Sequence, residues 1–169
     1  LDGNNQVHIA YENSSSTRLM SIVIADGLAA TEKVAQVGTH GYGMGFVVGA
    51  SGGMHLSFYN GSDSSGSLQY ATKSGTTWNS VTVDDGSTMV GTHSDIALDG
   101  SDNPHISYVN STPTPDEVMY AYHNGTAWTI EVIDATPYYA YDTSIDLDSS
   151  GNAHITYQVY NNSCGSCYN

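Results

Sequence analysis

Four stretches of the chain repeat one pattern without a gap, and this pattern decides the fold. They are residues 1–11 (LDGNNQVHIAY), 48–58 (VGASGGMHLSF), 98–108 (LDGSDNPHISY) and 147–157 (LDSSGNAHITY). Each stretch reads as the end of one strand, a turn rich in Gly, Asn, Asp and Ser, and a second strand. Counted from histidine to histidine, successive copies are 47, 50 and 49 residues apart. A fixed period of this length indicates a tandem repeat protein.

A second pattern supplies the remaining strands of two copies. Residues 68–78 (LQYATKSGTTW) align with residues 118–128 (VMYAYHNGTAW). Each reads as a third strand, a glycine-containing turn and the start of a fourth strand. Because no segment carries a convincing helical period, the sequence predicts an all-β protein. Four short antiparallel strands about every 50 residues are typical of β-propeller blades.

We expect one repeat domain over residues 1–169, incomplete at both ends. Its copies lie at approximately 1–38, 39–86, 87–135 and 136–169. The first copy begins at the end of its first strand and the last holds two strands, so we expect three, four, four and two strands. A closed propeller needs about four full blades. The missing strands would come from further blades of a longer chain or from other copies of this one, because an unpaired edge accepts a strand.

Charge and composition exclude several partners. The chain has 3 Lys+Arg against 17 Asp+Glu, a formal net charge of −14. Nucleic acids and anionic membrane surfaces are bound mainly through Lys and Arg, so neither is expected as a partner. The longest apolar stretches are shorter than the roughly 20 residues that a membrane-spanning helix needs. Abundant Gly, Ser, Thr, Asn and Tyr favour an extracellular or cell-surface location.

The turns between the expected third and fourth strands resemble a known motif. Residues 74–78 (SGTTW) and 124–128 (NGTAW) look like degenerate Asp-boxes of sialidase-type β-propeller repeats, although Lys73 and His123 stand in place of the defining Asp. Residues 103–108 (NPHISY) are similar to repeats of large secreted prokaryotic propeller proteins. The resemblance implies a propeller fold and a core position for Trp78 and Trp128.

The repeated histidines are expected to be buried structural residues. They are His8, His55, His105 and His154. In each second strand they alternate with large apolar residues and share a face with small ones. The small residues would let a neighbouring blade approach closely, and the histidines would form hydrogen bonds across to that blade. A shared metal is excluded because equivalent atoms on stacked sheets lie about 10 Å apart, whereas His–Zn bonds are about 2 Å.

Aspartates in the repeated turns have two interpretations. Carboxylate oxygens suit Ca²⁺, but Asp, Asn and Gly are also what such turns require. The candidate ligands are Asp2, Asp99, Asp102 and Asp148. Since the second copy has no carboxylate in its turn, we expect no cofactor, with calcium as the open alternative.

Two further sets of residues predict modification and cross-linking. The sequons for N-glycosylation are Asn13, Asn60, Asn110, Asn124 and Asn161. All except Asn124 are expected in loops between second and third strands, where hydrophilic loop chemistry explains them equally well. Cys164 and Cys167 are expected to form a disulfide within or between chains.

No catalytic residues are expected. A sialidase requires a cluster of arginines, and the chain has one, Arg18. The main hypothesis is a non-catalytic extracellular structural or adhesive protein, self-assembling edge to edge into a filament or oligomer. The alternatives are a lectin-like module that binds sugars through Trp78, Trp128 and its tyrosines, or a non-catalytic fragment of a larger secreted enzyme. In every version, the repeat predicts burial of one apolar position: Ile9, Leu56, Ile106 and Ile155.

Overall fold

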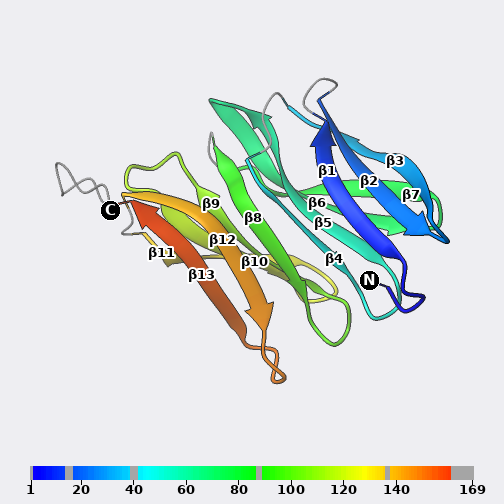
Figure 1. Cartoon of the computed structure of the whole chain (residues 1–169). Helices are drawn as coiled ribbons and strands as arrows, with labels where there is room; N and C mark the ends of the chain where they lie inside the picture. The colour runs from blue at the N-terminus through cyan, green and yellow to red at the C-terminus, as the bar shows by residue number, and fades with distance from the viewer. Residues whose placement is uncertain (1, 14–16, 39–41, 87–88, 136–137, 161–169) are drawn as a thin grey trace.

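The described part of the chain is built from antiparallel strands alone. The computed structural model describes residues 2–13, 17–38, 42–86, 89–135 and 138–160. These residues form 13 strands in four sheets and no helix, which confirms the all-β prediction. They contain no helical segment with the length and hydropathy of a membrane span. Figure 1 shows the four sheets side by side, from blue at the N-terminus to red at the C-terminus.

Each sheet lies within one copy of the repeat, and each strand pairs with its neighbour in the chain. The first sheet contains β1 (Val7–Asn13), β2 (Arg18–Ala25) and β3 (Leu28–Gln36). The second contains β4 (Met44–Val48), β5 (Met54–Ser62), β6 (Ser65–Ser74) and β7 (Thr77–Asp84). The third contains β8 (Val90–Leu98), β9 (Pro104–Asn110), β10 (Glu117–His123) and β11 (Trp128–Asp134). The fourth contains β12 (Tyr139–Leu147) and β13 (Ala153–Tyr160).

The turn before each second strand has the same backbone shape in all four copies. One residue in each turn has a positive φ: Asn5 (59°), Gly52 (82°), Asp102 (60°) and Gly151 (81°). The N–H of that residue donates to the carbonyl three residues earlier, at 2.9–3.0 Å. Asn, Asp and Gly adopt the left-handed conformation most readily. The turn geometry therefore explains the residue types that the repeat conserves between its copies.

Apolar layers between neighbouring sheets form the core. The first layer, between the first and second sheets, contains Leu19, Val37, Leu56, Phe58 and Ala71. The second layer, between the second and third sheets, contains Leu68, Val83, Val90, Ile96, Ile106, Tyr108, Met119 and Ala121. The third layer, between the third and fourth sheets, contains Val109, Val118 and Ala140.

The predicted burial of the repeated apolar position depends on the sheet. Leu56 and Ile106 are fully buried, whereas Ile9 is 42% exposed and Ile155 is half-buried. The prediction is wrong for Ile9 because its face of β1 points away from the second sheet. Val7, on the same face, is also exposed. No described residue buries this outer face of the first sheet.

A polar contact between sheets recurs with the repeat. Tyr108 of β9 donates to Asp84 at the end of β7, with 2.7 Å between Oη and Oδ2. One repeat later, Tyr157 donates to Asp134 at 2.5 Å. The first layer lacks this contact, since Phe58 occupies the tyrosine position. Where the repeat has tyrosine at this position, aspartate ends the last strand of the preceding sheet, and their hydrogen bond links the two sheets.

Candidate functional site

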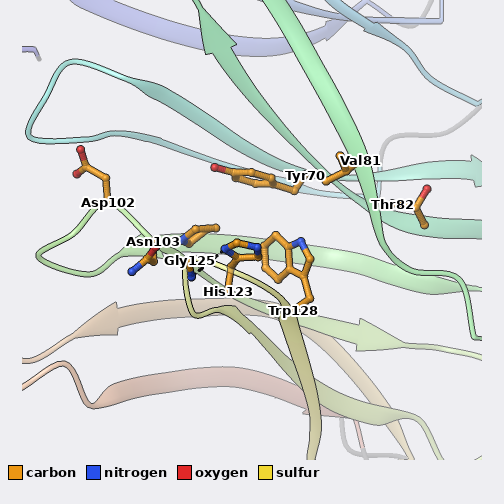
Figure 2. A pocket seen from close by; sticks show the side chains of 9 residues that line it. Tyr70, Val81, Thr82, Asp102, Asn103, His123, Gly125 and Trp128 are labelled. Atoms are coloured by element: carbon orange, nitrogen blue, oxygen red, sulfur yellow. Dashed lines mark hydrogen bonds between the residues drawn. The ribbon is translucent and has the colours of Figure 1, made fainter.

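A pocket of about 440 Å³ lies between the second and third sheets (Figure 2). The second sheet contributes Tyr70, Val81 and Thr82, and the third contributes Asp102, Asn103, Pro104, His123, Gly125 and Trp128. Both the repeated turn before β9 and the Asp-box-like turn before β11 therefore reach the pocket. A site of this kind needs two successive copies of the repeat.

Aromatic rings form one wall of the pocket. Trp128 lies opposite His123 in the ladder between β10 and β11, and their ring centroids are 5.2 Å apart. The Trp128 ring also meets Tyr70 of β6 edge to face, at 5.4 Å. Figure 2 shows Trp128 and His123 next to each other, with the ring of Tyr70 above them. Trp128 packs against the second layer but is only half-buried, so the predicted core position is correct only in part.

The hydroxyl of Tyr70 is held by a histidine of its own sheet. His55 Nδ1 lies 2.5 Å from Tyr70 Oη. Burial raises the pKa of Tyr70 and lowers the pKa of His55. Both groups are therefore neutral near pH 7, and this neutral pair positions the tyrosine ring against Trp128.

The rim of the pocket carries oriented polar groups. The backbone N–H of Gly125 donates to His123 Nδ1 at 3.1 Å, so the imidazole proton is on Nε2 in the neutral ring. Asn103 Nδ2 donates to Asp99 Oδ2 at 2.9 Å, which turns Asn103 Oδ1 toward Gly125. The rim thus offers a donor at His123 and an acceptor at Asn103.

Two aspartates build the turn at this rim. Asp99 Oδ1 accepts the N–H groups of Ser101 and Asn103, at 2.8 and 2.9 Å. Asp102 Oδ2 accepts from Ser51 Oγ at 2.8 Å, which ties the turn to the second sheet. Hydrogen bonding to Ser51 lowers the pKa of Asp102. Among the described residues, no group of three or more His, Cys, Asp or Glu could hold a metal. The calcium alternative, through Asp2, Asp99, Asp102 and Asp148, stays a prediction.

The other repeated histidines bond within their own sheets. His105 Nδ1 lies 2.5 Å from Tyr120 Oη, as in the previous copy. His8 Nε2 lies 3.0 Å from Asp2 Oδ2 of its own turn. The side chain of His154 is 69% exposed. The expected hydrogen bonds to neighbouring sheets are therefore wrong, because a tyrosine or turn aspartate of the same sheet is nearer. Burial is also wrong for His154, since the face of β13 that carries it is exposed.

The sequons lie closer to strands than expected. Asn13 and Asn110 end β1 and β9, and Asn60 lies inside β5, since these strands extend past the expected loop. Asn110 is 8% exposed, and its Nδ2 donates to Glu117 at 2.9 Å. Asn124 is exposed, in the turn next to the pocket. Asn161, Cys164 and Cys167 lie outside the described residues.

The turn carboxylates predict a loss of stability in acid. Side-chain and backbone hydrogen bonds from Asn152 lower the pKa of Asp148 to about 2. The hydrogen bond from His8 lowers the pKa of Asp2. A lowered pKa stabilises the fold above the unfolded value of about 3.9, and this stability is lost as pH falls toward the folded value. We expect the melting temperature to fall between about pH 4 and pH 2, and to fall less in an Asp2→Asn, Asp148→Asn variant. Asp85→Asn, an exposed carboxylate outside the turns, is the control, and an unchanged acid profile in the double variant would contradict the prediction.

Comparison with known proteins finds similarity at the level of structure. No family model matches the sequence, and no curated protein shows significant similarity. A fucose lectin from Kordia zhangzhouensis, solved with methyl-fucoside, is 18% identical with a TM-score of 0.53, covering 78% of this chain and 94% of that one. An endo-1,4-β-xylanase from Bacteroides thetaiotaomicron VPI-5482 is 11% identical with a TM-score of 0.50, covering 90% of this chain and 65% of that one. The chain thus spans less than two thirds of the xylanase, and at these identities the similarity concerns the fold alone.

Proposed function

We propose that this chain is a non-catalytic, extracellular carbohydrate-binding protein whose sheets act as blades of a propeller-like module. The observation that carries the proposal is the pocket between the second and third sheets, where a half-buried tryptophan lies next to oriented polar groups. Ligand pockets typically combine an apolar wall with a few polar groups that fix orientation. A sugar ring presents an apolar C–H face and hydroxyl groups, and so fits both features.

The composition of the pocket favours a neutral monosaccharide. Trp128 offers a flat apolar surface, and Asn103 and His123 offer an acceptor and a donor to hydroxyl groups, which donate and accept. The net charge of −14 disfavours anionic sugars through long-range repulsion. The fucose lectin with a similar fold, solved with methyl-fucoside, supports this ligand class.

Titration with methyl-fucoside and other neutral monosaccharides tests the proposal. We expect saturable binding, followed by calorimetry, to at least one of these sugars. Replacing Trp128 by Ala removes the stacking surface and is expected to weaken binding at this pocket at least about fivefold, since aromatic contacts contribute on the order of 1 kcal/mol or more. His154→Ala, an exposed change in the fourth sheet, is the control. Absence of binding to every sugar, or unchanged binding after Trp128→Ala, would refute the proposal.

Self-assembly is a second proposal, favoured by one observation. The outer face of the first sheet exposes Val7 (39%) and Ile9 (42%), and the fourth sheet exposes Val159 (54%) and Tyr160 (52%). Exposed apolar patches mark interaction surfaces. Association of copies through these faces would make the stability of the chain rise with its concentration.

A further inference from the structure

A second pocket, of about 350 Å³, adjoins the pocket of about 440 Å³ that contains Trp128. We call the first the inner pocket and the second the Trp128 pocket. The inner pocket lies where the first strands of three sheets end, and it is lined by residues 47–50, 96–99, 102 and 145–147. Asp102 lines both pockets. The two spaces therefore meet at one side chain.

The wall between the two pockets is the turn that precedes β9. Asp99 at the start of this turn lines the inner pocket, and Asn103 at its end lines the Trp128 pocket. Asn103 Nδ2 donates to Asp99 Oδ2 at 2.9 Å, and the N–H of Asp99 donates to the carbonyl of Asn103 at 3.0 Å. Figure 2 shows Asp102 at one side of the Trp128 pocket, beyond Asn103. A ligand that extends from one pocket to the other therefore crosses a single turn.

Both pockets lie at the same end of the sheets. In an antiparallel sheet the turn after the first strand and the turn after the third strand are at the same end. The Trp128 pocket includes the turn after β10, and the inner pocket lies where β4, β8 and β12 end. Figure 1 shows the turns that follow β8 and β12 together at one end of the molecule. One ligand can therefore enter both pockets from the same side.

The third copy of the repeat alone has a carboxylate at the turn position of Asp102. The equivalent residues of the other turns are Asn5, Gly52 and Gly151. Asp102 Oδ1 accepts from the N–H of Ala50 at 3.1 Å, across the gap between the second and third sheets. A Cβ at Gly49 would lie 2.8 Å from the same oxygen, so this approach requires glycine there. The repeat thus departs from its own pattern at the point where the pockets meet, and places a fixed acceptor for hydroxyl groups there.

We infer that the two pockets are neighbouring subsites for an oligosaccharide, with one sugar ring on Trp128 and the next ring in the inner pocket. The inference rests on the function proposed for the Trp128 pocket and adds the length of its ligand. Asp102 accepts from hydroxyl groups close to the bond that links the two rings. The second ring lies against Asp146 of β12 and the edges of β4 and β8. Backbone groups at a sheet edge are available to hydrogen-bond its hydroxyl groups.

The charges of the inner pocket select against a uronic acid as the second ring. Asp99, Asp102 and Asp146 line this pocket, and its lining residues include no Lys or Arg. A ligand carboxylate would be repelled at close range, whereas hydroxyl groups donate to carboxylates. We therefore expect a neutral second ring.

Calorimetry with matched monosaccharides and disaccharides tests the inference. The pairs are methyl-galactoside with lactose, methyl-glucoside with cellobiose, and methyl-fucoside with fucosyl-galactose. For at least one pair we expect one disaccharide per chain to bind at least about tenfold more tightly than the methyl glycoside, because the second ring adds several hydrogen bonds. The same disaccharide with a uronic acid as its second ring is expected to bind no more tightly than the methyl glycoside.

Two variants locate the gain in affinity at the inner pocket. Ala50→Phe fills this pocket from an exposed position, and is expected to reduce disaccharide affinity to that of the methyl glycoside, whose own binding stays unchanged. Asp146→Ala removes an exposed acceptor and is expected to weaken disaccharide binding several-fold. Ser101→Phe, an exposed change in the same turn that lines neither pocket, is the control.

The outcomes separate the inference from the proposed function. A disaccharide that binds no more tightly than its methyl glycoside, or a gain that survives both Ala50→Phe and Asp146→Ala, would overturn the inference and leave the proposed function intact. Methyl glycoside binding that is unchanged by Trp128→Ala would instead count against the Trp128 pocket. Absence of binding to every probe would refute both.

Discussion

Replacing Ile106 by Ala is expected to lower the free energy of unfolding by about 2–5 kcal/mol. Ile106 is fully buried in the second layer, so its removal loses apolar contacts and leaves a cavity. The same replacement at Ile9, which is 42% exposed, is expected to cost less than about 1 kcal/mol. Urea denaturation followed by far-ultraviolet circular dichroism measures both, provided that the slope with denaturant stays constant.

The pair is a matched control because both changes remove the same atoms from the same position of the repeat. Their difference therefore measures how completely a neighbouring sheet covers each face. Equal losses would mean that another surface covers the outer face of the first sheet in solution. If that surface belongs to a second copy, the loss at Ile9 should disappear on dilution.

The strand order could be predicted because each sheet is a local unit. Every ladder joins strands that follow each other in the chain, so turn residues and alternating apolar residues specify the pairing without long-range information. Burial was less predictable. The repeat gives Ile9 and Ile106 the same surroundings within a sheet, but exposure depends on whether another sheet lies against that face. The alternation of apolar and polar residues within a strand does not show whether another sheet covers that face.

The candidate site could be predicted only in part, because its two halves come from different copies. The aligned turns identify Trp128, but they do not place Tyr70 and Asn103 in a common pocket with it. Alignment places residues at equal positions of the repeat and does not show which faces meet. One feature of the sequence does indicate which sheets meet. A tyrosine in the second strand of one copy occurs with an aspartate at the end of the fourth strand of the preceding copy, and such a pair is in contact at Tyr108 and Asp84.

Gly91→Ala is expected to be among the most damaging single changes to the fold. Gly91 lies in β8 with φ +100°, and a Cβ there would lie 2.5 Å from Leu68 Cα and 2.7 Å from Leu68 N on the second sheet. A non-glycine residue at such a φ costs about 1–3 kcal/mol. Contact with backbone that has no side chain to move away costs about another 1–3 kcal/mol, so we expect a loss of about 2–6 kcal/mol.

Two other glycines separate these contributions to the loss at Gly91. Gly75 has φ +61° with nothing within 4 Å of its Cβ position, so Gly75→Ala carries the conformational cost alone. Gly100 has open space and no positive φ, and Gly100→Ala is expected to change stability by less than about 0.5 kcal/mol. If Gly91→Ala costs no more than Gly75→Ala, the backbones of the second and third sheets do not approach each other this closely at Leu68 and Gly91. The pocket bounded by Tyr70 and Trp128 would then need a different spacing of these sheets, so this comparison tests the geometry on which the candidate site depends.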